Sequence, residues 1–214
     1  MTVNVPHISP CFRHINMFKS LGKQLRQPSG SLGILVSRMM EMKNREYYRK
    51  IIKELNVQRG EKIFEIGYGP GFGISLVAKN EPDCLISGID FSVLMFKRAS
   101  KRNRKFIDRG TVSLKYGNFL TADLEKEQYD KIFCLNVIYF WSDLGLSFGK
   151  VHSLLKSGGS YFIFMIPVEE IKNLKFMEDF CKYPVENVES ELKIAGFSEV
   201  EYKLDKGYYI RAKK

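Results

Sequence analysis

Glycines at alternate positions mark the part of this 214-residue chain where a ligand site is easiest to place. They are Gly67, Gly69, Gly71 and Gly73. Residues 62–66 before them are apolar and rich in strand formers, and residues 74–78 after them have an apolar pattern compatible with a helix. A strand, a glycine turn and a helix begin a βαβ unit that holds a nucleotide-like ligand, because glycine lets the backbone approach that ligand without a Cβ.

The spacing and an adjacent acid indicate which ligand. A dinucleotide fingerprint, G-x-G-x-x-G, would need its third glycine at Phe72 or Ile74, and neither position fits. Glu65 stands two residues before the first glycine, where a carboxylate repels a pyrophosphate and suits a cationic ligand. S-adenosylmethionine (SAM) carries an ammonium and a sulfonium and has no phosphate, so the loop favours SAM over a dinucleotide.

A second acid supports this interpretation. Residues 85–89 form the next expected strand, which ends at Asp90, nineteen positions after Gly71. That is close to the roughly 20 residues expected before an acid that binds ribose hydroxyls. Here the sequence resembles the class I SAM-dependent methyltransferase family, with residues 65–71 similar to its first motif and residues 88–95 to its second. The resemblance runs from about Tyr48 to the C-terminus and is strongest to small-molecule methyltransferases of the quinone-biosynthesis type.

The resemblance implies an α/β fold: a Rossmann-like, doubly wound, seven-stranded sheet, mostly parallel and closed by an antiparallel C-terminal hairpin. Further strands are expected at 111–116, 131–137 and 161–166, a glycine turn at 156–159, and the hairpin at 200–204 and 208–212. Two helices, at 31–44 and 45–55, precede the first strand, where the family often has a lid over its substrate. We therefore expect a lid and substrate-binding extension over 1–58 and a SAM-binding core over 59–214, within one compact domain.

The resemblance also implies the residues that contact SAM and its product, S-adenosylhomocysteine. The expected set is Glu65, Gly67, Gly69, Gly71, Asp90, Phe91, Met95, Asn118, Phe119, Asn136 and Val137. Asn118 stands where relatives often have an Asp that binds the adenine amino group. Asn keeps an acceptor oxygen and loses the charge.

Candidates for substrate binding lie in the predicted lid and after the fourth strand. They are Met40, Tyr47, Tyr48 and Trp141, each of which is also compatible with a place in the core. The catalytic candidates are Tyr139, beside the expected methyl group, and His14, whose imidazole titrates near neutral pH. A surface position for His14 is the alternative.

Methyl transfer from SAM makes few demands on catalytic side chains. The sulfonium is already a good leaving group, so the enzyme mainly aligns the acceptor, and positioning supplies ~7–11 kcal/mol of the barrier. A base is needed only when the acceptor must lose a proton. We expect an enzyme that methylates O, N or C of an anionic or aromatic small molecule. The alternatives are an RNA- or membrane-associated methyltransferase recruited through its basic N-terminal region, and a SAM-binding protein without turnover.

Composition and charge limit the kinds of partner and the cellular location that we expect. The formal net charge is +10, which is compatible with nucleic acid, an anionic membrane surface or an acidic substrate. No apolar run of 18 residues predicts a membrane span, and no signal peptide is recognisable at the N-terminus. The four cysteines are scattered, so we expect free thiols, no metal site and a cytoplasmic location. The oligomeric state is left open.

Overall fold

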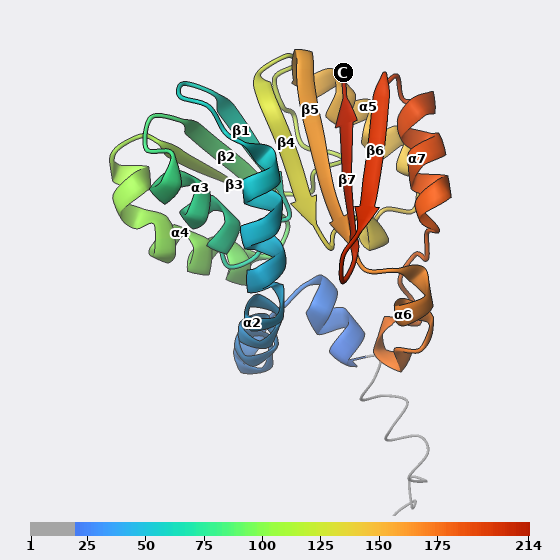
Figure 1. Cartoon of the computed structure of the whole chain (residues 1–214). Coiled ribbons are helices and arrows are strands. Elements are labelled where there is room, and N and C mark those ends of the chain that lie inside the picture. The colour runs from blue at the N-terminus through green and yellow to red at the C-terminus, as the bar shows by residue number, and fades with distance from the viewer. Residues whose placement is uncertain (1–19) are drawn as a thin grey trace, which may run out of the picture.

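The computed structural model describes residues 20–214, so the catalytic candidate His14 lies outside the described residues. A seven-stranded sheet in the order β3-β2-β1-β4-β5-β7-β6 crosses the molecule, and Figure 1 shows it with helices on both faces. The strands are β1 (Lys62–Ile66), β2 (Leu85–Asp90), β3 (Val112–Tyr116), β4 (Tyr129–Leu135), β5 (Leu155–Met165), β6 (Glu199–Leu204) and β7 (Tyr208–Lys213). The first five are parallel, and β7 runs antiparallel between β5 and β6. The predicted doubly wound sheet and its terminal hairpin are confirmed.

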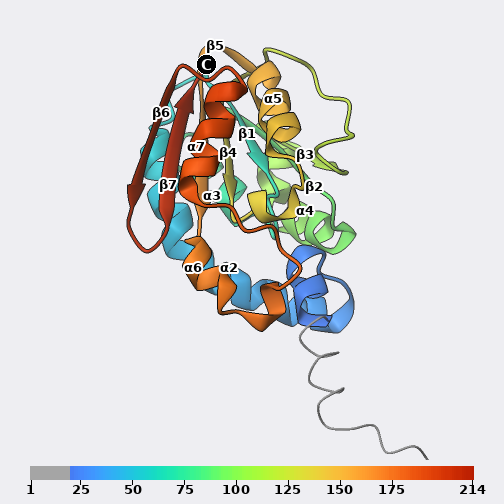
Figure 2. The same cartoon turned by 90° about the vertical axis from the view of Figure 1, so that its right-hand side faces the viewer.

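The helices form two layers. One face carries α2 (Gly30–Leu55), α3 (Phe72–Asn80) and α4 (Val93–Asp108). The other carries α5 (Leu144–Leu154) and α7 (Val185–Ile194), which Figure 2 shows side by side. Short helices η1 (Ile138–Phe140), α6 (Val168–Lys172) and η2 (Lys175–Met177) complete the described elements. The strand order reverses between β1 and β4, so the ligand crevice of such a sheet is expected at their carboxyl ends.

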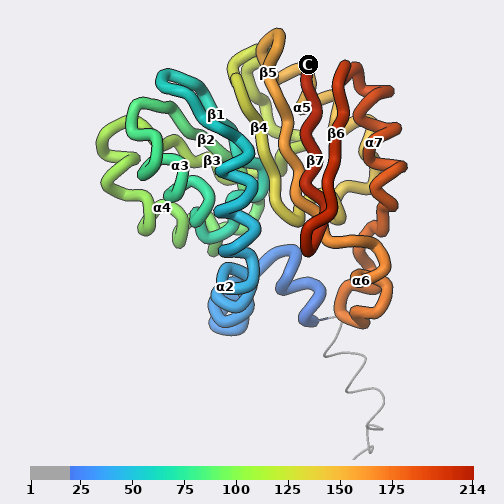
Figure 3. Tube along the Cα trace, in the orientation of Figure 1, coloured from blue at the N-terminus to red at the C-terminus, as the bar shows by residue number. Residues whose placement is uncertain are grey.

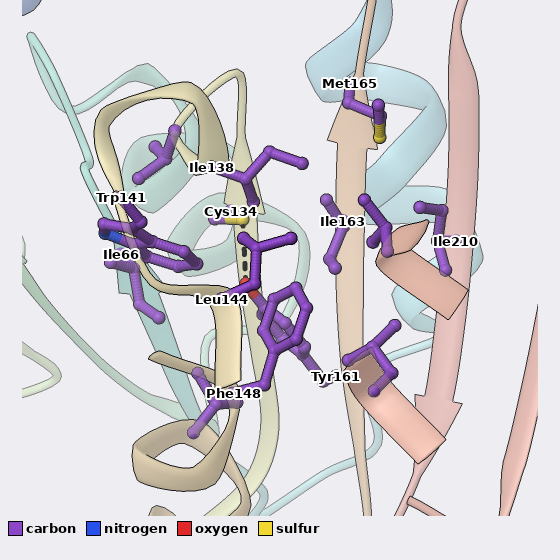
Figure 4. Packing of buried hydrophobic residues seen from close by; sticks show 14 of the residues in the cluster. Ile66, Cys134, Ile138, Trp141, Leu144, Phe148, Tyr161, Ile163, Met165 and Ile210 are labelled. Carbon is purple, nitrogen blue, oxygen red and sulfur yellow. Dashed lines mark hydrogen bonds between the residues drawn. The ribbon is translucent and has the colours of Figure 1, made fainter. Parts of the chain in front are cut away.

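Apolar side chains fill the space on both faces of the sheet. Successive residues of β4 alternate between the faces, so Cys134 packs against the α5 side while Phe133 packs against the α2 side. Figure 4 shows the α5 side, where the Cys134 sulfur lies 3.0 Å from the hydroxyl of Tyr161. Cys84 and Cys134 are buried free thiols, as predicted. Within residues 20–214 no group of His, Cys, Asp and Glu is arranged to hold a metal ion.

Helix α2 corrects one expectation. Residues 30–55 form a single helix, not two, and it begins after Ser29 rather than Ser31. No Gly or Pro interrupts residues 34–55, so nothing in the backbone ends the helix near Asn44. One face of the helix is buried throughout. Its second half packs on the sheet, while its first half extends past the carboxyl ends of the strands (Figure 1).

The end of the sheet beyond the strands is covered by helical segments. The segment of residues 20–26 and helix α6 lie at the same end as the first half of α2, as the trace in Figure 3 shows. A Cβ built on Gly22 would lie 2.5 Å from the carbonyl oxygen of Phe176, so the first of these segments packs closely against η2. In the described part of the chain, no helix is both long and apolar enough to cross a bilayer.

The glycine turn expected at 156–159 lies inside β5. Pairing with β4 shifts register between the pairs Tyr129–Leu155 and Lys131–Ser160, and Gly158 takes a positive φ of 74° there. The turn is therefore an irregularity within the strand, away from the carboxyl ends.

Candidate active site

A cavity of about 270 Å³ opens at the carboxyl ends of β1, β2 and β4, beneath the first half of α2. Most of the predicted contact residues line it. From the cofactor set these are Gly67, Gly69, Asp90, Phe91, Met95, Asn118, Phe119, Asn136 and Val137; from the substrate set they are Met40, Tyr48 and Trp141. Glu65, Gly71, Tyr47 and Tyr139 do not line it, for reasons given below.

The glycine loop after β1 forms the floor of the cavity. The Gly67 N–H donates to the Ile89 carbonyl at 2.8 Å, and φ is 72° at Gly67. A Cβ there would lie 2.5 Å from a methyl carbon of Val137, so only glycine fits. Gly69 has φ 51° and open space where its Cβ would be. A ligand can therefore approach the backbone closely at Gly69.

Gly71 belongs to helix packing instead of the cavity wall. It precedes α3, with φ 76°, and its carbonyl accepts a hydrogen bond from Asn103 Nδ2 at 3.1 Å. A Cβ at Gly71 would lie 2.8 Å from that of Ala99. Glycine is required at this position because α3 and α4 approach closely there, and Gly71 does not line the cavity.

Glu65 lies behind the loop, fully buried, and its carboxyl oxygens find no hydrogen-bond partner in the described residues. Burial raises the pKa of Glu65 to about 8, against the opposing effects of the neighbouring Tyr48 side chain and the Ile74 backbone. The ring of Tyr48, which lines the cavity, and this carboxyl group both lie within 3 Å of the point where Gly73 would carry a Cβ. An unpartnered buried acid beside the cavity fits a cationic ligand group.

Asp90 is held rigidly at the end of β2. One carboxyl oxygen accepts from the Gly69 N–H at 2.9 Å and the other from the Ser92 N–H at 2.8 Å. Burial raises the pKa of Asp90 to about 6, although these two hydrogen bonds oppose the shift. The group is therefore ionised at neutral pH, and each oxygen keeps a lone pair for a ligand hydroxyl.

Beyond Asp90 the cavity has aromatic and amide walls. Phe119 packs on Trp141 with ring centroids 5.8 Å apart. Asn118 accepts from the Leu120 N–H through its side-chain oxygen at 3.0 Å, which orders the loop after β3. Trp141 is only 5% exposed yet lines the cavity, so it belongs both to the core and to the site.

An amide pair joins helix α2 to the end of β4. Asn136 has a left-handed backbone, with φ 58°, and its Nδ2 donates to Asn44 Oδ1 at 3.3 Å. Non-glycine residues take this conformation rarely, and Asn is among those that tolerate it best. Backbone strain of this kind clusters at functional sites.

Tyr139 and Tyr47 do not line the cavity. The Tyr139 hydroxyl lies 3.3 Å from Asn136 Oδ1 and accepts from the Ile166 N–H, outside the cavity wall. Burial raises the pKa of Tyr139 well above its ordinary value, so its hydroxyl stays protonated and acts by orienting Asn136. Tyr47 stacks on Phe164 at 4.3 Å, over the sheet.

Helix α2 contributes polar residues that we did not predict. Ser37, Glu41 and Asn44 line the cavity together with Tyr48. Their positions follow helical spacing, which is the sequence signal that could have found them. Glu41 is 6% exposed, and both its oxygens lie 2.8 Å from Arg102 Nη2 on α4.

That ion pair connects α2 to the glycine loop. Arg45 also bonds Glu41, at 3.1 Å, while Arg102 donates to the Pro70 carbonyl at 3.0 Å. Both guanidinium groups lie over the ring of Phe72, at 5.3 and 5.8 Å. One network thus fixes α2, α4 and the loop relative to one another.

The fold and the glycine-loop site are those of α/β proteins that bind a nucleoside-bearing ligand at the switch point of the sheet. Comparisons with known proteins show which of these the chain resembles. A methyltransferase-domain family model matches residues 64–161. The chain is 29% identical over 163 residues to YdaC of Bacillus subtilis, an uncharacterized methyltransferase; the match covers 76% of this chain and 86% of YdaC.

Solved structures share the fold. A SAM-dependent methyltransferase from Aquifex aeolicus matches 78% of this chain and 88% of its own, with 19% identity and a TM-score of 0.65. Phosphoethanolamine N-methyltransferase 2 of Haemonchus contortus, in complex with SAM, matches 89% of this chain and 43% of its own, with 21% identity and a TM-score of 0.67. The methyltransferase-domain match over residues 64–161 and the methyltransferase relatives support the predicted family, the class I SAM-dependent methyltransferases, and the predicted enzyme class.

Proposed function

We propose that the cavity binds SAM and that the chain transfers its methyl group to a small-molecule acceptor held between α2 and the segment after β4. Gly67 and Gly69 would accept the methionine part against the backbone, and Asp90 would bind the ribose hydroxyls. Phe91, Met95, Asn118 and Phe119 would surround the adenine. The unpartnered carboxyl group of Glu65 and the open space at Gly69 support this assignment.

One observation carries the choice of a small acceptor. The cavity that holds Asp90 and Gly69 continues without interruption to Met40, Phe140 and Trp141, beneath α2. Donor and acceptor can therefore share one cavity, and α2 above it would limit the access of water. The apolar side chains suit an aromatic or aliphatic body, and the Asn44–Asn136 pair suits one polar group on it. Arg26 also lines the cavity and would favour an anionic acceptor.

When bound, SAM supplies an activated methyl group. The residues of this chain then only have to hold the acceptor in line with it. The cavity-lining residues among 20–214 include no histidine, and the two lining carboxylates, Glu41 and Asp90, are already engaged by arginine or by backbone N–H groups. We therefore expect an acceptor atom that needs little deprotonation, such as a neutral amine, a phenolate or a stabilised carbanion.

The test is turnover with a panel of such acceptors, following S-adenosylhomocysteine by mass spectrometry. Asn136→Ala should raise the KM of an accepted substrate while leaving SAM affinity within about twofold, because Asn136 faces the acceptor end. Asn187→Ala, on α7, is the matched control and should change neither. A panel-wide absence of product, with SAM bound, would reject the small-molecule acceptor.

A further inference from the structure

The outer face of α2 carries a stripe of exposed apolar side chains that do not pack in the core of the described residues. Its members are Leu32, Leu35, Met39 and Met42, which are 48%, 58%, 50% and 71% exposed. Steps of three, four and three residues put them side by side along three turns of the helix. We call these four residues the α2 stripe.

The other side of the same helix makes the contacts with the core and with the cavity. Val36 and Tyr48 are buried, and Glu41 is fixed by Arg102. The stripe therefore adds nothing to the described core. Single exposed apolar residues are ordinary, whereas four contiguous ones on a helix mark an interaction surface.

Exposed cations border the stripe, and the nearest exposed acid on the same face of α2, Glu46, is paired with Lys50 and Lys206. Arg38 and Lys43 flank the stripe, lying three residues after Leu35 and four after Met39, and both are exposed. Within residues 20–214 neither of them forms an ion pair.

Helix α4 is also basic, and it lies on the other side of α2. Residues 97–105 carry six basic residues and no acid. Arg98 and Arg102 bind Ser37 and Glu41 on the face of α2 opposite the stripe. The exposed Lys97 and Lys101 therefore add to the positive charge of the neighbouring surface without bordering the stripe.

An apolar stripe bordered by Lys and Arg is the pattern of a helix that lies in the plane of a membrane interface, with side chains among the acyl boundary and cations on anionic headgroups. A nucleic acid would engage the cations and leave the apolar side chains in water. We propose that α2 docks this enzyme on the surface of an anionic phospholipid bilayer. The inference goes beyond methyl transfer and does not depend on it. Because α2 also covers the cavity, docking holds the site next to the lipid and suits an acceptor that partitions into the bilayer.

Vesicle sedimentation tests the proposal with the full chain. Vesicles of phosphatidylcholine with 30% phosphatidylglycerol should bind the protein at least about tenfold more tightly than pure phosphatidylcholine, because cations beside the interface are attracted to anionic lipid. Leu35→Ser with Met42→Ser should weaken that binding by about tenfold or more, since the apolar contact is lost. Leu146→Ser with Ile194→Ser is the matched control: those side chains are 72% and 73% exposed on α5 and α7, away from α2, and binding should not change.

Three results would overturn the proposal. One is absence of binding to the anionic vesicles. Another is binding that the stripe variant keeps in full, which would show that charge alone recruits the protein, as for RNA. The third is a dimer in sedimentation velocity that the stripe variant dissolves, which would make the stripe a contact between copies. Melting temperature and S-adenosylhomocysteine affinity should be unchanged in both variants, so a folding defect is distinguishable from lost docking.

Discussion

Replacing Asp90 by Asn tests the ribose site with the smallest change of shape. Asp90 is 8% exposed and its two oxygens accept from Gly69 and Ser92. An ionised acceptor contributes ~1.5–3 kcal/mol to a hydrogen bond, so losing the charge opposite the ribose should weaken S-adenosylhomocysteine binding by roughly 10- to 150-fold.

The effect on folding should be small, because two terms oppose each other. A pKa of about 6 against an ordinary 3.8 means that ionising the buried group costs about 3 kcal/mol of stability at neutral pH, and Asn removes that cost. The Asn amide, however, must face one backbone N–H that the carboxylate now accepts from, at a penalty of ~1–3 kcal/mol. We expect the melting temperature to move by only a few degrees.

The assay is calorimetric titration at pH 7.5 beside thermal denaturation. Asp108→Asn, at the far end of α4, is the matched control, since its surface pair with Arg104 at 3.7 Å has little effect on stability. An unchanged dissociation constant in a well-folded Asp90→Asn protein would refute the assignment of Asp90 to the ribose.

Three further substitutions probe the loop, the buried acid and the lid. Gly67→Ala should lower both the melting temperature and the affinity for S-adenosylhomocysteine, because the left-handed φ costs ~1–2 kcal/mol and the new Cβ meets Val137. The control Gly110→Ala, with φ 76° and open space around the new Cβ, should lose only the stability that the left-handed φ costs. The melting temperature of Glu65→Gln should rise relative to that of the wild type as pH increases from about 5 to 9, because the raised pKa of Glu65 makes wild-type stability fall over that range. A difference in melting temperature that stays constant with pH would contradict the raised pKa of this buried carboxyl group. Glu41→Gln should lower the free energy of unfolding by ~3 kcal/mol or more in denaturant melts, since it leaves Arg102 without its carboxylate. An equal loss of stability in the exposed control Glu46→Gln would show that the burial of Glu41 is irrelevant.

The sheet could be predicted from the sequence because each strand has a recognisable local pattern. The strands at 62–66 and 85–90 are short apolar runs ended by glycine or by an acid, and the hairpin before Tyr208 is marked by Asp205 and Gly207. The break expected at Asn44 was wrong because no Gly or Pro interrupts α2 there. The same buried face continues, and it covers the cavity in the first half of the helix and the sheet in the second.

Cavity residues could be predicted only where their position is fixed by the residues next to them in the sequence. The places of Asp90 and Gly69 in the cavity lining followed from the sequence because the loop and the strand end fix their positions. The places of Gly71 and Tyr139 outside it did not, since a glycine that faces α4 and a tyrosine that hydrogen-bonds Ile166 look in sequence like those that face a ligand. Glu41 and its partner Arg102 are 61 residues apart, so no local pattern could join them.

A crystal structure of the protein with S-adenosylhomocysteine tests the central claim most directly. Our account predicts the ribose on Asp90, the homocysteine along Gly67 and Gly69 beside Tyr48, and the sulfur pointing toward Asn136 and Trp141. A ligand bound elsewhere, or one whose sulfur points away from the Asn44–Asn136 pair, would contradict the proposed site of methyl transfer.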